Sequence, residues 1–189
     1  MRLNNIINFF IEQKLLANED AELVKFGLKQ GIFLGINILI ILFIGGMFHE
    51  FLSSICFLVC FIVLRSYAGG YHAKTAFRCF VISVFIIILV FAMIHFLSFS
   101  TNFLAVIIAI SFLILWEISP VDNENRVLDN VEKSVYRRIS HYVLCMEVFI
   151  ASLCGYFDKK NLLEAVTMAL LVSCILASFG KLTYKFKRK

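Results

Sequence analysis

RSYAGGYHAKTAFRC, residues 65–79, is the longest polar interruption in the first two thirds of a strongly apolar chain. Apolar runs lie on both sides of it, at 51–66 and 80–98, and each approaches the roughly 20 residues that cross about 30 Å of hydrocarbon. The stretch is therefore predicted to be a loop between two transmembrane helices. It also holds an imidazole, a thiol, two adjacent glycines and several basic side chains, so we expect the functional site here.

The composition is typical of a membrane protein. Of the 189 residues, 61% are hydrophobic, whereas soluble globular proteins are roughly 45–50% apolar. The chain contains 21 Phe and one Pro, and its mean hydropathy is +0.89. Only helices or closed barrels satisfy the backbone in lipid, and no stretch alternates polar and apolar residues as a strand would. We expect an all-α, polytopic integral membrane protein with a single membrane-embedded domain over residues 1–189.

The sequence predicts about six transmembrane helices preceded by an amphipathic helix. In residues 1–30, apolar side chains from Leu3 to Leu15 recur at helical spacing among polar ones, which indicates a helix on the membrane surface. The second apolar run is short and could be re-entrant. A full span with Arg65 at the interface is favoured, because the loops then alternate between the two sides. The six apolar runs are 31–48, 51–66, 80–98, 103–118, 142–157 and 162–179.

The basic residues indicate the orientation in the membrane. If all six runs span, all but two of the 18 Lys and Arg residues lie on one side, and Lys159 and Lys160 lie on the other. The positive-inside rule then places both termini, the 65–79 loop and a 119–141 loop in the cytoplasm, beneath the cell membrane. This side keeps thiols reduced, and its basic residues would contact anionic lipid headgroups. The net charge of +5 is explained in this way, without nucleic acid as a partner.

His72 and Cys79 are the candidate catalytic pair. A histidine can take the proton of a nearby cysteine, and the thiolate then attacks a carbonyl carbon. Seven residues correspond to about 10.5 Å along a helix, whereas the two groups must approach to roughly 3 Å. The segment therefore has to turn back on itself if the pair is catalytic. A histidine and a cysteine in one loop do not by themselves establish catalysis.

The neighbouring residues suit the same chemistry. Gly69 and Gly70 give the backbone the freedom that a reversal requires, because glycine adopts positive φ without steric penalty. A helix that begins near Cys79 would place free N–H groups beside the sulfur, where they and Arg78 would favour a thiolate and hold an oxyanion. Arg65 could stabilise the developing negative charge or bind a carboxylate of the substrate.

No carboxylate within the 65–79 loop is available to orient the imidazole. The candidates lie on the neighbouring 119–141 loop or just before it, and the sequence does not choose among Glu117, Asp122, Asn123 and Asn125. No HExxH or CxxC motif is present, so we expect no metal site.

The pattern Arg65-x4-Gly70-x-His72-x6-Cys79 resembles the signature of the accessory gene regulator protein B (AgrB) family. The resemblance extends over nearly the whole chain. It includes the length, the amphipathic N-terminal segment, the several spans and the stretch PVDNEN at 120–125, which is similar to that of clostridial-type members.

This resemblance implies a membrane-bound cysteine endopeptidase that processes a short propeptide, AgrD, into a cyclic autoinducing peptide for quorum sensing. Cys79 would be the nucleophile and His72 the general base, while Arg65 and Gly70 match positions on which the family's activity depends. The acyl-enzyme thioester would be attacked by an internal Cys or Ser of the peptide, giving a thiolactone or a lactone. No cofactor is expected, and a homodimer is compatible with so small a bundle.

The alternative from another class is a small peptide transporter or exporter without proteolytic activity, in which the polar loop would line a path and His72 would relay protons. The thiol discriminates between the two classes. Catalysis demands Cys79, whereas a transporter should tolerate its replacement by alanine.

Overall fold

A computed structural model describes residues 10, 13, 21–71, 76–122 and 129–187 of the chain. Within these residues the protein consists of helices, and its only extended pairing is an isolated bridge between Gly69 and Val121. The predicted all-α, polytopic architecture is confirmed. The helices are α2 (Ala21–Met47), α3 (Phe51–Ala68), α4 (Ala76–Phe96), α5 (Thr101–Ile118), α6 (Asn130–Tyr156) and α7 (Lys160–Lys187).

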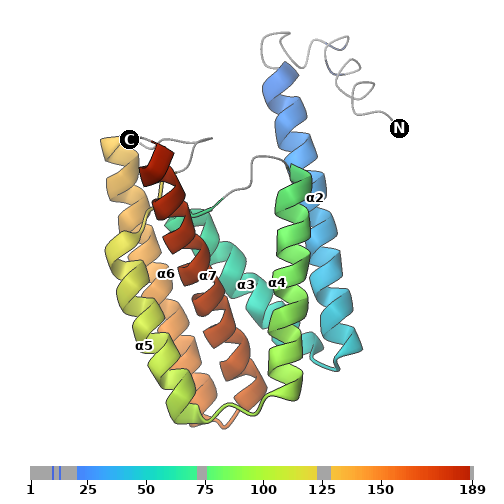
Figure 1. The fold of residues 1–189 in the computed structure, drawn as a ribbon, viewed down its shortest axis with the longest axis vertical. Helices are drawn as coiled ribbons and strands as arrows, with labels where there is room; N and C mark the ends of the chain where they lie inside the picture. The colour runs from blue at the N-terminus through green and yellow to red at the C-terminus, as the bar shows by residue number, and fades with distance from the viewer. Residues whose placement is uncertain (1–9, 11–12, 14–20, 72–75, 123–128, 188–189) are drawn as a thin grey trace.

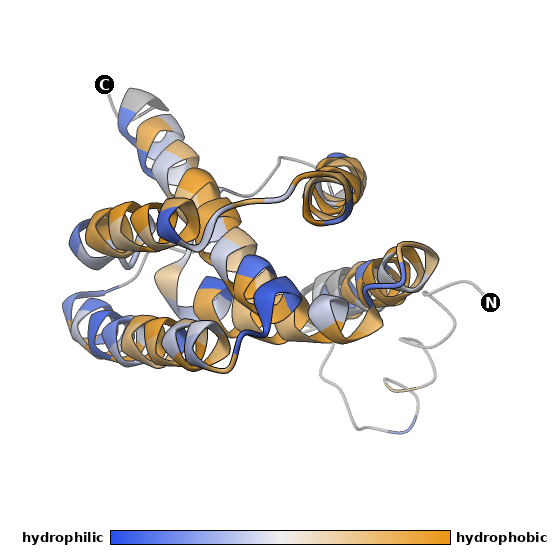
Figure 2. Ribbon diagram, turned by 90° about the horizontal axis from the view of Figure 1, so that it is seen from below, coloured by the Kyte–Doolittle hydropathy of each residue, from blue (hydrophilic) through white to orange (hydrophobic). Residues whose placement is uncertain are grey.

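Five of these helices, α3 to α7, are long and apolar enough to cross a membrane. In α2 the corresponding apolar segment is the shorter Gly31–Met47. Figure 2 shows that most of the ribbon is apolar, with hydrophilic residues mainly near the ends of helices. Many large apolar side chains are exposed on the outer faces, among them Phe43, Phe85 and Phe149. Such faces are what lipid tails contact in a bilayer.

Two predicted boundaries differ from the structure. Residues 21–30, assigned above to a surface helix, belong to α2 because this stretch is rich in helix formers and contains no proline. The predicted 119–141 loop ends at Asp129, where a capping box begins α6: the Asp129 side chain accepts from the Glu132 N–H at 2.7 Å, and the Glu132 carboxylate accepts from the Asp129 N–H. The rest of the N-terminal segment lies largely outside the described residues.

Consecutive helices run in opposite directions, as Figure 1 shows. The start of α2, the end of α3, the start of α4, the end of α5, the start of α6 and the end of α7 therefore lie at one end of the bundle, at the top of the figure. The sequence placed the 65–79 loop and most of the basic residues at this end.

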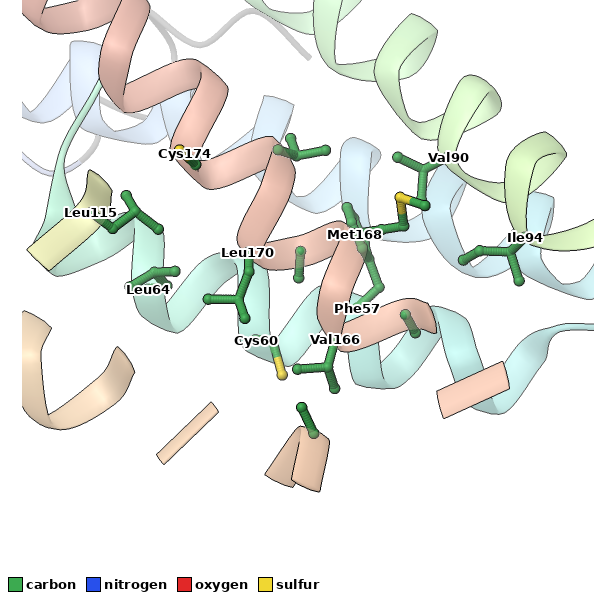
Figure 3. Close-up of a cluster of buried hydrophobic side chains, with 14 of the residues drawn as sticks. Phe57, Cys60, Leu64, Val90, Ile94, Leu115, Val166, Met168, Leu170 and Cys174 are labelled. Carbon is green, nitrogen blue, oxygen red and sulfur yellow. The ribbon is translucent and has the colours of Figure 1, made fainter. Parts of the chain in front are cut away.

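The C-terminal helix α7 is the centre of the bundle and the most buried of the five spanning helices. It packs against α3, α5 and α6, and it touches α4. In Figure 3, the labelled side chains of α7 meet those of α3 in the core, with Leu170 and Val166 beside Cys60. α2 and α4 pack against each other, and α2 also packs against α3, so this pair forms one flank of the molecule.

Candidate active site

The chain reverses sharply after α3, as the two adjacent glycines predict. Gly69 caps the helix with φ +73°, and its N–H donates to the Arg65 carbonyl at 3.3 Å. Gly70 follows with φ +130°. Side chains other than hydrogen rarely tolerate these values, so both positions require glycine. The reversal carries the chain away from the axis of α3 and towards α7.

Arg65 holds this turn together from the last turn of α3. Its Nη1 donates to the Gly69 carbonyl at 2.8 Å, and its Nη2 donates to the Tyr71 carbonyl. The planar guanidinium presents donors in a fixed fork, and here the fork spans two carbonyls of the turn. A Cβ on Gly70 would collide with Arg65 Nη1. Arg65 therefore fixes the backbone that leads into the following segment.

The same turn is docked on two other parts of the chain. The Tyr71 N–H donates to the Leu176 carbonyl of α7 at 2.9 Å, and the Val121 N–H donates to the Ala68 carbonyl at 2.9 Å. Gly180 makes the approach to α7 possible, because a Cβ there would lie 2.6 Å from the Gly70 carbonyl carbon and from the Tyr71 nitrogen. α7 is thus the platform on which the turn rests.

Cys79 lies in the first turn of α4, which begins at Ala76. The first N–H groups of a helix have no partner within it, and the helix dipole makes this end positive. Negative charge that develops at the sulfur or at a nearby carbonyl oxygen would be stabilised there.

Cys79 and Arg65 line the same cavity, of about 170 Å³, between α2, α3, α4 and α7. Ser83 lies four residues after Cys79 and hence on the same face of α4, and Asn37 faces the cavity from α2. Most of the remaining wall is apolar. It consists of Phe33, Leu34, Ile38, Ile41, Phe57, Leu58, Phe61, Ile62, Tyr71, Phe80, Ile82, Ile86, Ile87, Val172 and Leu176.

The remaining predicted site residues lie in different places. Arg78 is exposed on α4 beside Cys79, and Glu117 is exposed at the end of α5, a helix that contributes nothing to the cavity wall. Asp122 follows the docked Val121, and its carboxylate pairs with Lys133 of α6 at 2.7 Å. His72, Asn123 and Asn125 lie outside the described residues. Among the described residues, no cluster of His, Cys, Asp and Glu could hold a metal ion.

Sequence reasoning missed two residues of this site. Asn37 was detectable, because it is the only amide or charged side chain between Gly31 and Phe48. Gly180 carried no comparable signal, since a glycine near the end of an apolar helix is common in membrane proteins. Its importance depends on a turn more than a hundred residues earlier in the chain, which only the fold brings beside it.

Comparison with known proteins agrees with the motif. A family model described as Accessory gene regulator B matches residues 3–177. An AgrB-like protein of Clostridium perfringens strain SM101 is 24% identical over 178 residues, covering 86% of this chain and 83% of the relative. A second AgrB-like protein, of Clostridium perfringens strain 13, is 26% identical over 177 residues, covering 88% of this chain and 83% of the relative. No solved structure matches the chain.

Proposed function

The chain belongs to the accessory gene regulator B family, and we propose that it is a membrane-bound cysteine endopeptidase that cleaves and cyclises an AgrD-like propeptide. Membership of this family supports a part in processing a quorum-sensing peptide. The product would be a thiolactone or lactone ring. The catalytic residues would be Cys79 as nucleophile and His72 as general base, with the peptide N–H groups at the start of α4 as oxyanion donors.

One observation carries this proposal. Cys79 lies at the positive end of a membrane helix and lines a largely apolar cavity beside Arg65, which holds the glycine turn leading towards His72. A buried structural cysteine would be surrounded by packed side chains, whereas a nucleophile needs a space in which the carbonyl of a substrate can approach. The cavity supplies that space.

In the first step, the Cys79 thiol would give its proton to His72, and the sulfur would attack the scissile carbonyl of the propeptide. The C–N bond then breaks, and the released amine of the C-terminal tail takes the proton from the imidazolium. The N-terminal part of the propeptide remains on the enzyme as a thioester.

In the second step, an internal thiol or hydroxyl of the bound peptide would attack the thioester. The new acyl bond closes the ring, the bond to Cys79 breaks, and the cysteine recovers its proton. Exchange of one thioester for another is nearly balanced in energy, whereas hydrolysis is downhill. An apolar cavity suits this step because it excludes water while the peptide nucleophile is held close.

The site would face the cytoplasm at the cell membrane, on the grounds of the basic residues at that end of the bundle. The same residues would contact anionic headgroups, where an amphipathic leader of the propeptide would also bind. Processing would thus occur at the interface where enzyme and substrate are both concentrated.

Intact mass spectrometry of the full chain in lipid nanodiscs, with a candidate propeptide, tests the proposal. Wild type should carry a peptide-sized adduct that hydroxylamine removes, and Cys79→Ala and His72→Ala should carry none. Cys145→Ala is the matched control, because Cys145 is an exposed free thiol on α6 and its loss should leave the adduct unchanged. Cleavage that survives in Cys79→Ala would contradict the proposal and favour an exporter.

A further inference from the structure

Asn37 is a polar side chain in the middle of the apolar helix α2. Its Oδ1 is completely enclosed, and no donor among the described residues reaches it. A buried hydrogen-bond acceptor without a donor is unfavourable, and nearly all such groups in folded proteins have a partner. The described part of the chain therefore carries an acceptor that its own packing does not use.

The place of this acceptor indicates what it is for. Asn37 lines the cavity that Cys79 and Arg65 also line, and it faces them from a different helix. Cavities of about 150 Å³ are large enough to bind benzene, so the observed 170 Å³ accommodates one bulky apolar side chain but not a folded peptide. A side chain that enters brings its own backbone N–H with it.

We propose that Asn37 positions the propeptide for cleavage: its side-chain amide turns so that Oδ1 faces the cavity and accepts a hydrogen bond from a backbone N–H of the substrate close to the scissile carbonyl. The apolar wall around Asn37 holds the side chain of that substrate segment. This inference rests on the proposed function and adds to it a specific anchor on α2.

The arrangement explains why the substrate would be held in register. Apolar contacts hold a side chain without fixing the direction of the backbone, whereas one hydrogen bond inside a largely apolar cavity fixes it. Asn37 on α2 would hold the backbone of the substrate, and α4 carries the nucleophile Cys79. The packing of α2 against α4 therefore sets the distance from Asn37 to the Cys79 sulfur. Asn37 is therefore a positioning residue, distinct from the groups that carry out bond exchange.

A cycle of protein and peptide variants tests this contact. Asn37→Leu keeps the size of the side chain but removes the acceptor, and Asn37→Ala is a second, smaller variant should the first not be recovered folded. Each is assayed for kcat/KM of adduct formation with a set of propeptides in which single backbone N–H groups near the scissile bond are methylated. Asn102→Leu, at an exposed position at the start of α5, is the matched control.

We expect Asn37→Leu to lower kcat/KM about three- to tenfold, the value of one neutral hydrogen bond, while Asn102→Leu has no effect. At one position, methylation of the peptide should lower kcat/KM with the wild-type enzyme but should cause no further loss with Asn37→Leu, because the two changes remove the same hydrogen bond. The melting temperature of Asn37→Leu should be equal to or above that of wild type, since the enclosed oxygen has no partner among the residues that the structure describes.

Two results would overturn the inference. If the protein and peptide effects are additive at every methylated position, Asn37 does not contact the substrate backbone, and its partner is an ordered water or another group. If Asn37→Leu lowers the melting temperature together with the rate, Asn37 is a structural residue. Failure of wild type itself to form a Cys79 adduct would instead contradict the proposed function, and this inference with it.

Discussion

Gly180→Ala is the substitution that best tests whether α7 positions the catalytic turn. The added Cβ would lie 2.6 Å from the Gly70 carbonyl carbon and the Tyr71 nitrogen, and 2.9 Å from the Gly70 Cα. Carbon atoms in contact are about 3.5–4.0 Å apart, so the turn has to move by roughly 1 Å. All the opposing atoms are backbone, which means that no side-chain rotation relieves the clash.

The displacement should affect the rate far more than the stability. Overpacking destabilises by about 1–3 kcal/mol, and alanine is better than glycine within a helix by about 0.5–1 kcal/mol, so the net loss is about 0–2.5 kcal/mol. A misplacement of about 1 Å at a reacting centre can lower a rate about 100-fold. The hydrogen bond from the Tyr71 N–H to Leu176, 2.9 Å long, is the contact expected to break first.

The assay is the pre-steady-state rate at which the Cys79 adduct forms with excess propeptide. Thermal unfolding is measured in the same lipid. Gly155→Ala is the matched control, since a Cβ on this glycine of α6 would meet only a Leu163 methyl group at 3.9 Å. We expect Gly155→Ala to keep the wild-type rate. An unchanged rate in Gly180→Ala would refute the reasoning, because it would show that the turn works without its close contact to α7.

Two further substitutions test other parts of the structure. Arg65→Lys keeps the charge, but a lysine cannot reach the Gly69 and Tyr71 carbonyls together. The lost charged hydrogen bond is worth about 1.5–3 kcal/mol, so adduct formation should slow about 10- to 100-fold. A wild-type rate would mean that only the charge of Arg65 matters. Glu147→Leu removes a carboxyl group that is 2% exposed and whose oxygens have no hydrogen-bond partner among the described residues. It should raise the free energy of unfolding by about 1–3 kcal/mol at an unchanged rate, with Glu22→Leu at an exposed position of α2 as control. A large loss of activity in Glu147→Leu would instead assign this buried acid a function, as acids within membrane helices often have.

The architecture followed from the sequence because hydrocarbon allows the backbone few solutions. Long apolar runs had to form helices, and the polar breaks between them had to lie at the two membrane surfaces. The helix ends were less accurate. α2 and α6 begin about ten residues earlier than their apolar runs, because helix formation is governed by backbone hydrogen bonds and caps and does not stop where the hydrocarbon ends.

The chemistry of the site was also largely local. Gly69 and Gly70 predicted a turn after α3, and both have the positive φ that such a turn requires. The further prediction, that the turn returns His72 to Cys79, falls on residues outside those described. The assignments of Cys79 and His72 follow from residue type and from the family pattern, and remain predictions about chemistry.

Tertiary structure alone decided what surrounds that local motif. The prediction allowed Arg65 to bind substrate, whereas the fold directs its guanidinium to two carbonyls of its own turn. Gly180 and Asn37 join the site from helices far away in sequence, one as a platform and one across the cavity. The sequence records the chemical type of each residue, but the closeness of two backbones and the surroundings of an enclosed acceptor are set only once the helices have packed.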